Sequence, residues 1–316
     1  MNPPLPAAAS PLLQPLLARA ARPCPVVVAS RTGVHVATGD PDVPLLSVVA
    51  PGGARLPGAL VLAGPVRSGP RPDSGAQRSR PDLHRHHRLV DRDRLAGSPA
   101  LDRFGAAGRL LVGDGTVRLD DMAVRVRRWW APPAVRLPER PSALHDGAAA
   151  LVIALEPAAR TIPAVVAGAA GRLACAVGSG DARATARAVH AMVGLGPGLT
   201  PAADDVLVGA LLCWHHLAAA GFGAAAATGG IVSTAVRERL DRTSAVSAAL
   251  LHHAVRGSGV PEALLLLDAL REPAAIASAL DAVVRIGHDT GASIAYGVEL
   301  AVSSVLAAVE PARVAR

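Results

Sequence analysis

The stretch GLGPGLTPAADDVLVG (194–209) has three glycines on alternate positions and two prolines, followed by two adjacent aspartates and an apolar run. Glycine and proline favour a loop, and an apolar run after acidic residues is typical of a helix start. The Thr-Pro pair predicts an N-cap at Thr200 and the first helical residue at Pro201. Asp204 and Asp205 then fall in the first turn, where the helix dipole favours negative charge. The stretch therefore predicts a tight loop that leads into a helix.

The same residues also fit a binding site. Alternate glycines at 194, 196 and 198 suit a loop of exposed backbone amides, which can bind an anion against a helix N-terminus. Adjacent aspartates diverge by about 100° around a helix, so they serve different faces. One can orient the loop or hold a cation while the other meets a substrate. From these residues alone, a capped loop and a small-ligand site remain equally open.

The chain that surrounds this stretch is alanine-rich and helical in pattern. After residue 157 the apolar periodicity predicts helices over 158–170, 182–193, 203–220, 223–240, 244–256, 260–270, 273–286 and 291–309. Caps and glycines separate these segments. The C-terminal half is therefore predicted to be a helical domain, 156–316.

The preceding half has a different rhythm, with short β-branched runs bounded by Gly, Pro or Asp. The predicted strands are 25–30, 33–38, 45–50, 58–64, 108–113, 122–129 and 150–155. They predict a small barrel or mostly antiparallel sheet within a domain at 24–155, after an N-terminal extension at 1–23. The whole chain is predicted to be α+β, with a β-rich N-terminal part and a helical C-terminal part.

Residues 67–94 break that rhythm, because they are rich in Arg, Pro, His and Ser and have almost no apolar periodicity. They predict a disordered insertion, and an out-of-frame origin of this GC-rich segment remains an alternative. Eight arginines and four aspartates in this segment contribute +4 of the net charge of +7. No aromatic residue interleaves with them, so the stacking groups expected of a single-strand binder are missing. We therefore expect no nucleic-acid partner.

Three isolated cysteines suggest neither a disulfide framework nor a zinc site, which fits a reducing cytoplasm. The N-terminus is interrupted by prolines and makes a poor signal peptide. The most membrane-like run, 206–228, carries two central histidines and is better explained as a buried helix and its turn. The sequence predicts a cytoplasmic protein that does not enter a membrane.

A second stretch, IGHDTGASIAYG (286–297), aligns with the first when Gly297 is placed on Gly209. His288 then falls on Thr200, and Ser293 falls on Asp205. Both stretches begin a helix after a glycine, and both carry a further glycine that allows another helix or a ligand to approach closely. The alignment predicts two quasi-equivalent helix starts that converge on one site.

Three motifs occur in order: GLGPGLTPxxDDxLxG, then RTSxxSxxLLxxAxxG (242–257), then GHxTG. Together they resemble the AllH-type family, long catalogued as a domain of unknown function, which includes a subunit of oxamate carbamoyltransferase. The resemblance covers about 190–300. The chain departs from the family's pattern at Ala202-Ala203, where Ser-Gly is common, and at Ser293, where aspartate is common.

The resemblance implies one subunit of a multi-subunit enzyme of allantoin and purine breakdown. That enzyme interconverts oxalurate and phosphate with oxamate and carbamoyl phosphate. Its expected partners are the other subunits and these small anions. Acyl transfer of this kind needs donors for the anion and for a developing oxyanion.

Residue roles follow from the resemblance as expectations. His288, Asp205 and Arg242 are the expected catalytic residues. His288 would act as a proton donor or oxyanion partner, Asp205 or its neighbour Asp204 would orient ligand amides, and Arg242 would clamp a carboxylate. The expected anion-binding residues are Gly196, Gly198, Leu199, Thr200, Asp204, Thr243, Ser244, Thr290 and Gly291. No metal ligand is predicted and no cofactor is required, although a divalent cation remains an option. Two alternatives stay open: a stand-alone small-anion or nucleotide-binding protein or enzyme, and a non-catalytic structural subunit.

Overall fold

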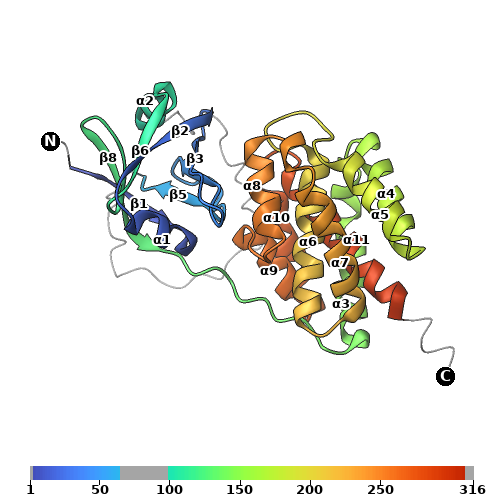
Figure 1. Cartoon of the computed structure of the whole chain (residues 1–316). Coiled ribbons are helices and arrows are strands. Elements are labelled where there is room, and N and C mark those ends of the chain that lie inside the picture. Colours follow the sequence, from blue (N-terminus) through green and yellow to red (C-terminus); the bar gives the residue numbers. More distant parts are fainter. Residues whose placement is uncertain (1–2, 65–98, 310–316) are drawn as a thin grey trace, which may run out of the picture.

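The computed structural model describes residues 3–64 and 99–309. A β-rich N-terminal part is joined to a helical C-terminal part, as Figure 1 shows. The predicted α+β fold is therefore confirmed. The predicted insertion at 67–94 lies outside the described residues.

The N-terminal part is a closed barrel, which is one of the two predicted arrangements. Within the described residues its strand order is β1-β5-β4-β3-β2-β6-β7-β8. Neighbouring strands are antiparallel except for the pairs β1·β8 and β4·β5, which are parallel. The strands are β1 (Leu5–Ala9), β2 (Arg22–Ala29), β3 (Gly33–Ala37), β4 (Leu45–Val49), β5 (Ala59–Leu62), β6 (Arg109–Gly113), β7 (Thr116–Leu119) and β8 (Met122–Trp129).

Two barrel strands were not predicted from the sequence. Strand β1 lies in the residues that were assigned to an N-terminal extension, and it closes the barrel between β5 and β8. Its sequence, LPAAA, lacks the β-branched residues that marked the other strands, so pairing rather than local propensity decides its state. Strand β7 is only four residues long. The short helices α1 (Gln14–Ala18) and α2 (Pro99–Ala106) contribute Leu16, Leu101 and Phe104 to the barrel core.

The C-terminal part contains the long helices. They are α3 (Pro141–Ala159), α4 (Ala164–Gly178), α5 (Ala182–Met192), α6 (Ala202–Ala219), α7 (Gly223–Arg237), α8 (Ala245–Ala254), α9 (Pro261–Ala269), α10 (Ile276–Val284) and α11 (Thr290–Val309). Single turns of 3-10 helix lie at Pro11–Leu13, Leu240–Arg242 and Pro273–Ala275. Most of the predicted helices are confirmed within a few residues.

The predicted strand at 150–155 is wrong, because these residues lie inside α3. The run ALVIAL is apolar and partly β-branched, but alanines precede it and proline occupies the first turn of the helix. Leu144, Ala148, Leu151 and Leu155 are buried at helical spacing on one face. The predicted helix at 158–170 is also wrong in part, since Pro163 separates α3 from α4.

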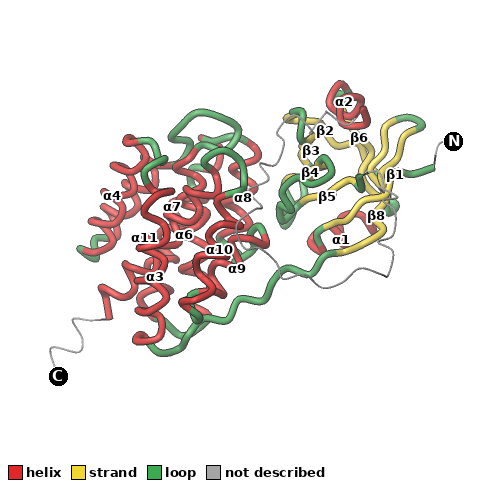
Figure 2. Tube along the Cα trace, turned by 180° about the vertical axis from the view of Figure 1, so that it is seen from behind, coloured by secondary structure: helices red, strands yellow, loops and turns green. Residues whose placement is uncertain are grey.

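Helix α6 lies in the middle of the helices in both views (Figures 1 and 2). Every residue from Ala202 to Trp214 is buried, so this part of the helix is apolar all round apart from its two aspartates. Helix α11 packs along it and is long and apolar enough to cross a membrane by length and composition. However, 56% of its most apolar window is buried inside the structure, as in the core helix of a folded domain.

The barrel and the helices meet through a small apolar contact. Leu45 of β4 packs with Val246 and Ala249 of α8. An ion pair between Arg55 and Glu262, 3.1 Å between Nη2 and Oε1, joins the loop before β5 to α9. The residues that connect β8 to α3 form an extended loop in Figure 2.

Candidate functional site

Asp204 ties the glycine loop to the start of α6. Its Oδ1 accepts a hydrogen bond of 2.8 Å from the backbone N–H of Gly194, and its Oδ2 accepts one of 2.5 Å from the Thr243 hydroxyl. The side chain is fully buried, and this burial raises its pKa although both hydrogen bonds act to lower it. The first aspartate of the pair therefore orients the loop, one of the two roles considered for the pair.

The start of α6 differs from the prediction by one residue. Pro201 is the N-cap, and no side chain caps the helix. The N–H of Ala203 is bonded instead to the carbonyl oxygen of Leu195, at 3.2 Å, so the folded loop itself satisfies this donor. The Thr200 hydroxyl is free to pair with the Thr290 hydroxyl across the two helix starts, at 3.2 Å.

The glycine loop exposes backbone donors. Gly194, Gly196 and Gly198 have φ values of +78°, +120° and +97°, which L side chains rarely adopt. The amides of Gly196, Gly198, Leu199 and Thr200 form no hydrogen bond within the described part of the chain. These N–H groups lie beside the N-terminus of an 18-residue helix, an arrangement that favours a bound anion.

Asp205 lies one residue further along α6 and has no such bonds. It is 1% exposed, and neither carboxylate oxygen has a hydrogen-bond partner among the described residues. Burial raises its pKa well above its ordinary value, and the nearby charges of Asp204 and Asp289 add to the rise. The hydroxyls of Thr290 and Thr200 stand close enough to oppose that rise, but neither forms a hydrogen bond of ordinary geometry with the carboxylate.

Helices α6 and α11 are related in the way that the two aligned stretches predict. A Cβ on Gly209 would lie 1.9 Å from the carbonyl oxygen of Ile294, and a Cβ on Gly297 would lie 2.0 Å from that of Val206. Ile294 is the residue that aligns with Val206, so the two contacts are reciprocal. The helices begin at Ala202 and Thr290, which are also aligned positions. The two helix starts are therefore quasi-equivalent and come together.

The second motif packs against the loop. The carbonyl oxygen of Arg242 would lie 2.5 Å from a Cβ on Gly194, so only glycine fits at position 194 of the loop. The Ser244 hydroxyl donates to the carbonyl oxygen of Leu199 and also accepts from the N–H of Ser247 as the N-cap of α8. The Arg242 side chain is exposed, and we find no partner for it within the described residues.

The third motif contributes unequally. Thr290 joins the site through its hydroxyl contact with Thr200. His288 is 85% exposed and is hydrogen-bonded to its neighbour Asp289, 2.8 Å from Nδ1 to Oδ1. Gly291 is buried, and its N–H donates to the carbonyl oxygen of Ile286, so it packs α11 against α10 and its amide is already bonded. The structure brings Asp204, Asp205, Thr243, Ser244 and Thr290 to the loop and leaves His288 in solvent.

Three polar residues near the site were not among the predicted site residues. Ser247 and Ser293 are 1% and 0% exposed, and neither hydroxyl has a partner in the described structure. Ser293 could have been found, because it aligns with Asp205. Asp289 has no signal in the sequence beyond its place in the third motif.

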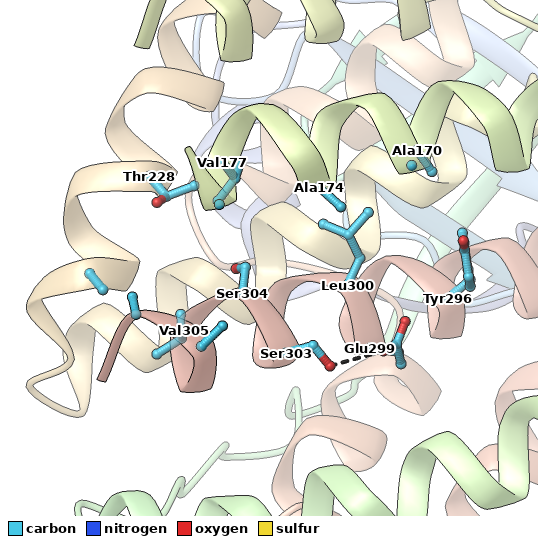
Figure 3. A pocket seen from close by; sticks show the side chains of 15 residues that line it. Ala170, Ala174, Val177, Thr228, Tyr296, Glu299, Leu300, Ser303, Ser304 and Val305 are labelled. Atoms are coloured by element: carbon cyan, nitrogen blue, oxygen red, sulfur yellow. Dashed lines mark hydrogen bonds between the residues drawn. The ribbon is translucent and has the colours of Figure 1, made fainter. Parts of the chain in front are cut away.

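A cavity of about 430 Å³ lies elsewhere, between α4, α7 and α11 (Figure 3). Its lining includes Tyr296, Leu300 and Thr228, and none of the predicted site residues. Glu299 lines it too and accepts a 2.9 Å hydrogen bond from Ser303. Among the residues that the structure describes, no three His, Cys, Asp or Glu side chains are grouped as metal ligands.

These features define an α+β protein with a candidate small-ligand site where two quasi-equivalent helices begin. Residues 192–302 match the family model described as oxamate carbamoyltransferase subunit AllH. The family resemblance is therefore confirmed over this part of the chain, which contains the glycine loop, α6, α8 and most of α11. No solved structure matches the chain.

Proposed function

We propose that this chain is a subunit of an oxamate carbamoyltransferase-like complex that acts in allantoin and purine breakdown in the cytoplasm. The observation that carries the proposal is the family match over 192–302, which spans the loop and the helix starts of the candidate site. The proposed reaction converts oxalurate and phosphate into oxamate and carbamoyl phosphate. A phosphate oxygen bonds to the carbamoyl carbon, the bond from that carbon to the oxamate nitrogen breaks, and this nitrogen takes the proton of the phosphate.

The groups around the loop suit the charges of this reaction. The unused amides of Gly196, Gly198, Leu199 and Thr200 would bind a phosphate or carboxylate at the positive end of α6. Arg242, whose side chain is exposed beside the loop, would bind both oxygens of a second carboxylate group. His288, exposed at the start of α11, would supply a proton once a ligand or a partner subunit covers it.

A catalytic centre usually excludes water, which strengthens its electrostatic interactions. Here the loop residues Pro197, Gly198 and Leu199 and the His288 side chain are exposed. This exposure supports a site that is completed by another subunit. A divalent cation that neutralises a bound phosphate fits the proposal as an additional component.

The test is a native affinity purification of the tagged chain from its own host, followed by an assay of carbamoyl phosphate formation from oxalurate and phosphate. Co-elution of partner subunits together with activity supports the proposal. If the chain elutes alone and binds small anions, the stand-alone binding protein is favoured. If partners co-elute and activity is indifferent to Asp205 and His288 substitutions in folded variants, a structural subunit is favoured.

A further inference from the structure

The carboxylate of Asp205 accepts no hydrogen bond of ordinary geometry, although the Thr200 and Thr290 hydroxyls lie beside it. Both oxygens are buried, and neither has a partner among the described residues. A carboxylate that is shielded from water and left unbonded costs stability, so such a group requires a reason. The neighbouring Asp204 is equally buried, but each of its carboxylate oxygens accepts a hydrogen bond, one from Gly194 and one from Thr243.

The surroundings of Asp205 offer the opposite kind of group. The positive ends of α6 and α11 meet here through Thr200 and Thr290, and free loop amides lie beside them. Converging helix N-termini disfavour a cation, and a buried carboxylate disfavours a simple anion. A ligand that satisfies both must carry an anionic end and an N–H donor in one small molecule.

We propose that Asp205 binds the amide N–H of a small anion whose carboxylate or phosphate is held by the amides of the glycine loop. The ligand class is an anionic primary amide or carbamoyl compound. This inference rests on the proposed function, because it assigns the ligand of the same site and says which end of that ligand is recognised by which residues.

The hydroxyls of Thr200 and Thr290 provide the way to the carboxylate. Both residues are half-buried, both stand beside Asp205, and they are hydrogen-bonded to each other at 3.2 Å. A hydroxyl can donate or accept and can rotate to suit a new partner. The ligand N–H takes the place of this mutual contact and reaches the carboxylate between the two helix starts.

Such a site distinguishes an amide from a methyl group of the same size. Oxamate and pyruvate share a carbonyl group bonded to a carboxylate and differ by NH2 against CH3, so they isolate the contribution of the N–H. A hydrogen bond from the ligand N–H to the Asp205 side chain corresponds to a preference of about tenfold or more for oxamate. A methyl group also leaves the buried carboxylate unpaired, which strengthens the discrimination.

The experiment measures oxamate and pyruvate binding by titration calorimetry, with the full chain and with the complex recovered from the native purification. The variants are Asp205→Leu, which removes both acceptors at similar volume, and Asp205→Asn, which keeps one. Asp241→Asn is the control, because this carboxylate is exposed in the turn before Thr243. Circular dichroism establishes that each variant is folded before it is titrated.

We expect wild type and Asp241→Asn to prefer oxamate by about tenfold or more, Asp205→Asn to show a smaller preference, and Asp205→Leu to bind the two ligands equally. Equal binding by wild type, a preference retained in Asp205→Leu, or binding of neither ligand overturns the inference. Absence of carbamoyl transfer with the oxamate preference intact overturns the proposed function alone. Should Asp205→Leu fail to fold, the comparison of wild type with Asp205→Asn decides.

Discussion

Gly209 of α6 and Gly297 of α11 occupy reciprocal positions at one helix crossing. Each faces a backbone carbonyl oxygen of the other helix, that of Ile294 for Gly209 and that of Val206 for Gly297. No side chain fits between the two backbones at either point. The crossing holds the two helix starts together, and therefore the hydroxyls of Thr200 and Thr290 as well.

Alanine at either crossing glycine should destabilise the helical part. The added Cβ would lie about 2 Å from a carbonyl oxygen, so the helices must separate, at a cost of about 3 kcal/mol or more. Chemical denaturation of Gly209→Ala and Gly297→Ala measures this loss. Gly230→Ala is the matched control, because this helical glycine is exposed and faces open space. The control should be neutral or more stable by up to about 1 kcal/mol, and an equal loss in all three variants would contradict the assignment.

Asp204→Ala should loosen the glycine loop. The change leaves the N–H of Gly194 and the Thr243 hydroxyl without their acceptor, and we expect a loss of about 2–4 kcal/mol in the free energy of unfolding. Thr243→Val should lose part of this amount, and Thr243→Ser should lose little because it keeps the hydroxyl. Urea denaturation gives the values. Asp281→Ala, an exposed aspartate on α10, serves for comparison, and a loss as small as in that variant would refute the tethering role.

Asp205→Asn should make the protein more stable at neutral pH. The folded-state pKa of Asp205 is raised above its unfolded value, so the folded state holds the proton more tightly, and stability falls as the pH rises through the folded pKa. Asparagine cannot ionise, so the variant avoids this loss, with a gain of about 1–3 kcal/mol. The gain should shrink as the pH is lowered toward the unfolded pKa. Thermal denaturation over a pH series tests the prediction, and a variant that is less stable than wild type near neutrality would exclude it.

Two buried histidines, His35 and His253, should make the folded protein less stable in mild acid. Burial lowers the pKa of His35 to about 4, and burial together with the charges of His252 and Arg256 lowers that of His253 to about 4. Both are neutral in the folded protein, so stability is present above the unfolded pKa and is lost as the pH falls from about 6.5 toward about 4. Each contributes a loss of about 2 kcal/mol between about pH 7 and about pH 5.

His253→Leu is the test of this second pH effect. The variant should show a shallower decline of urea midpoint with acidification than wild type, by the contribution of one histidine. His288→Leu is the control, since the His288 side chain is 85% exposed to solvent. If His253→Leu and wild type decline in parallel, the His253 prediction fails.

The sequence by itself determined the elements whose local signals are strong. The β-branched runs bounded by turn residues gave six of the strands, and the alanine-rich periodic segments gave most of the helices, because side-chain spacing and turn residues act within a few positions. It also placed the glycine loop ahead of a helix and aligned the second helix start with the first. The secondary structure predicted from the sequence was wrong at 150–155 and at β1, where pairing and packing with distant residues override weak local propensity.

Only the tertiary structure decided how the aspartate pair is divided. The two residues are adjacent in sequence and identical in chemistry, but Asp204 meets the loop and Thr243, which is 39 residues away, while Asp205 meets a helix start that comes 85 residues later. Which acceptor is satisfied depends on which donors the packing of α6, α8 and α11 brings within hydrogen-bond distance. Burial, which raises the pKa of both carboxyls, likewise arises from contacts between segments that are far apart in the chain.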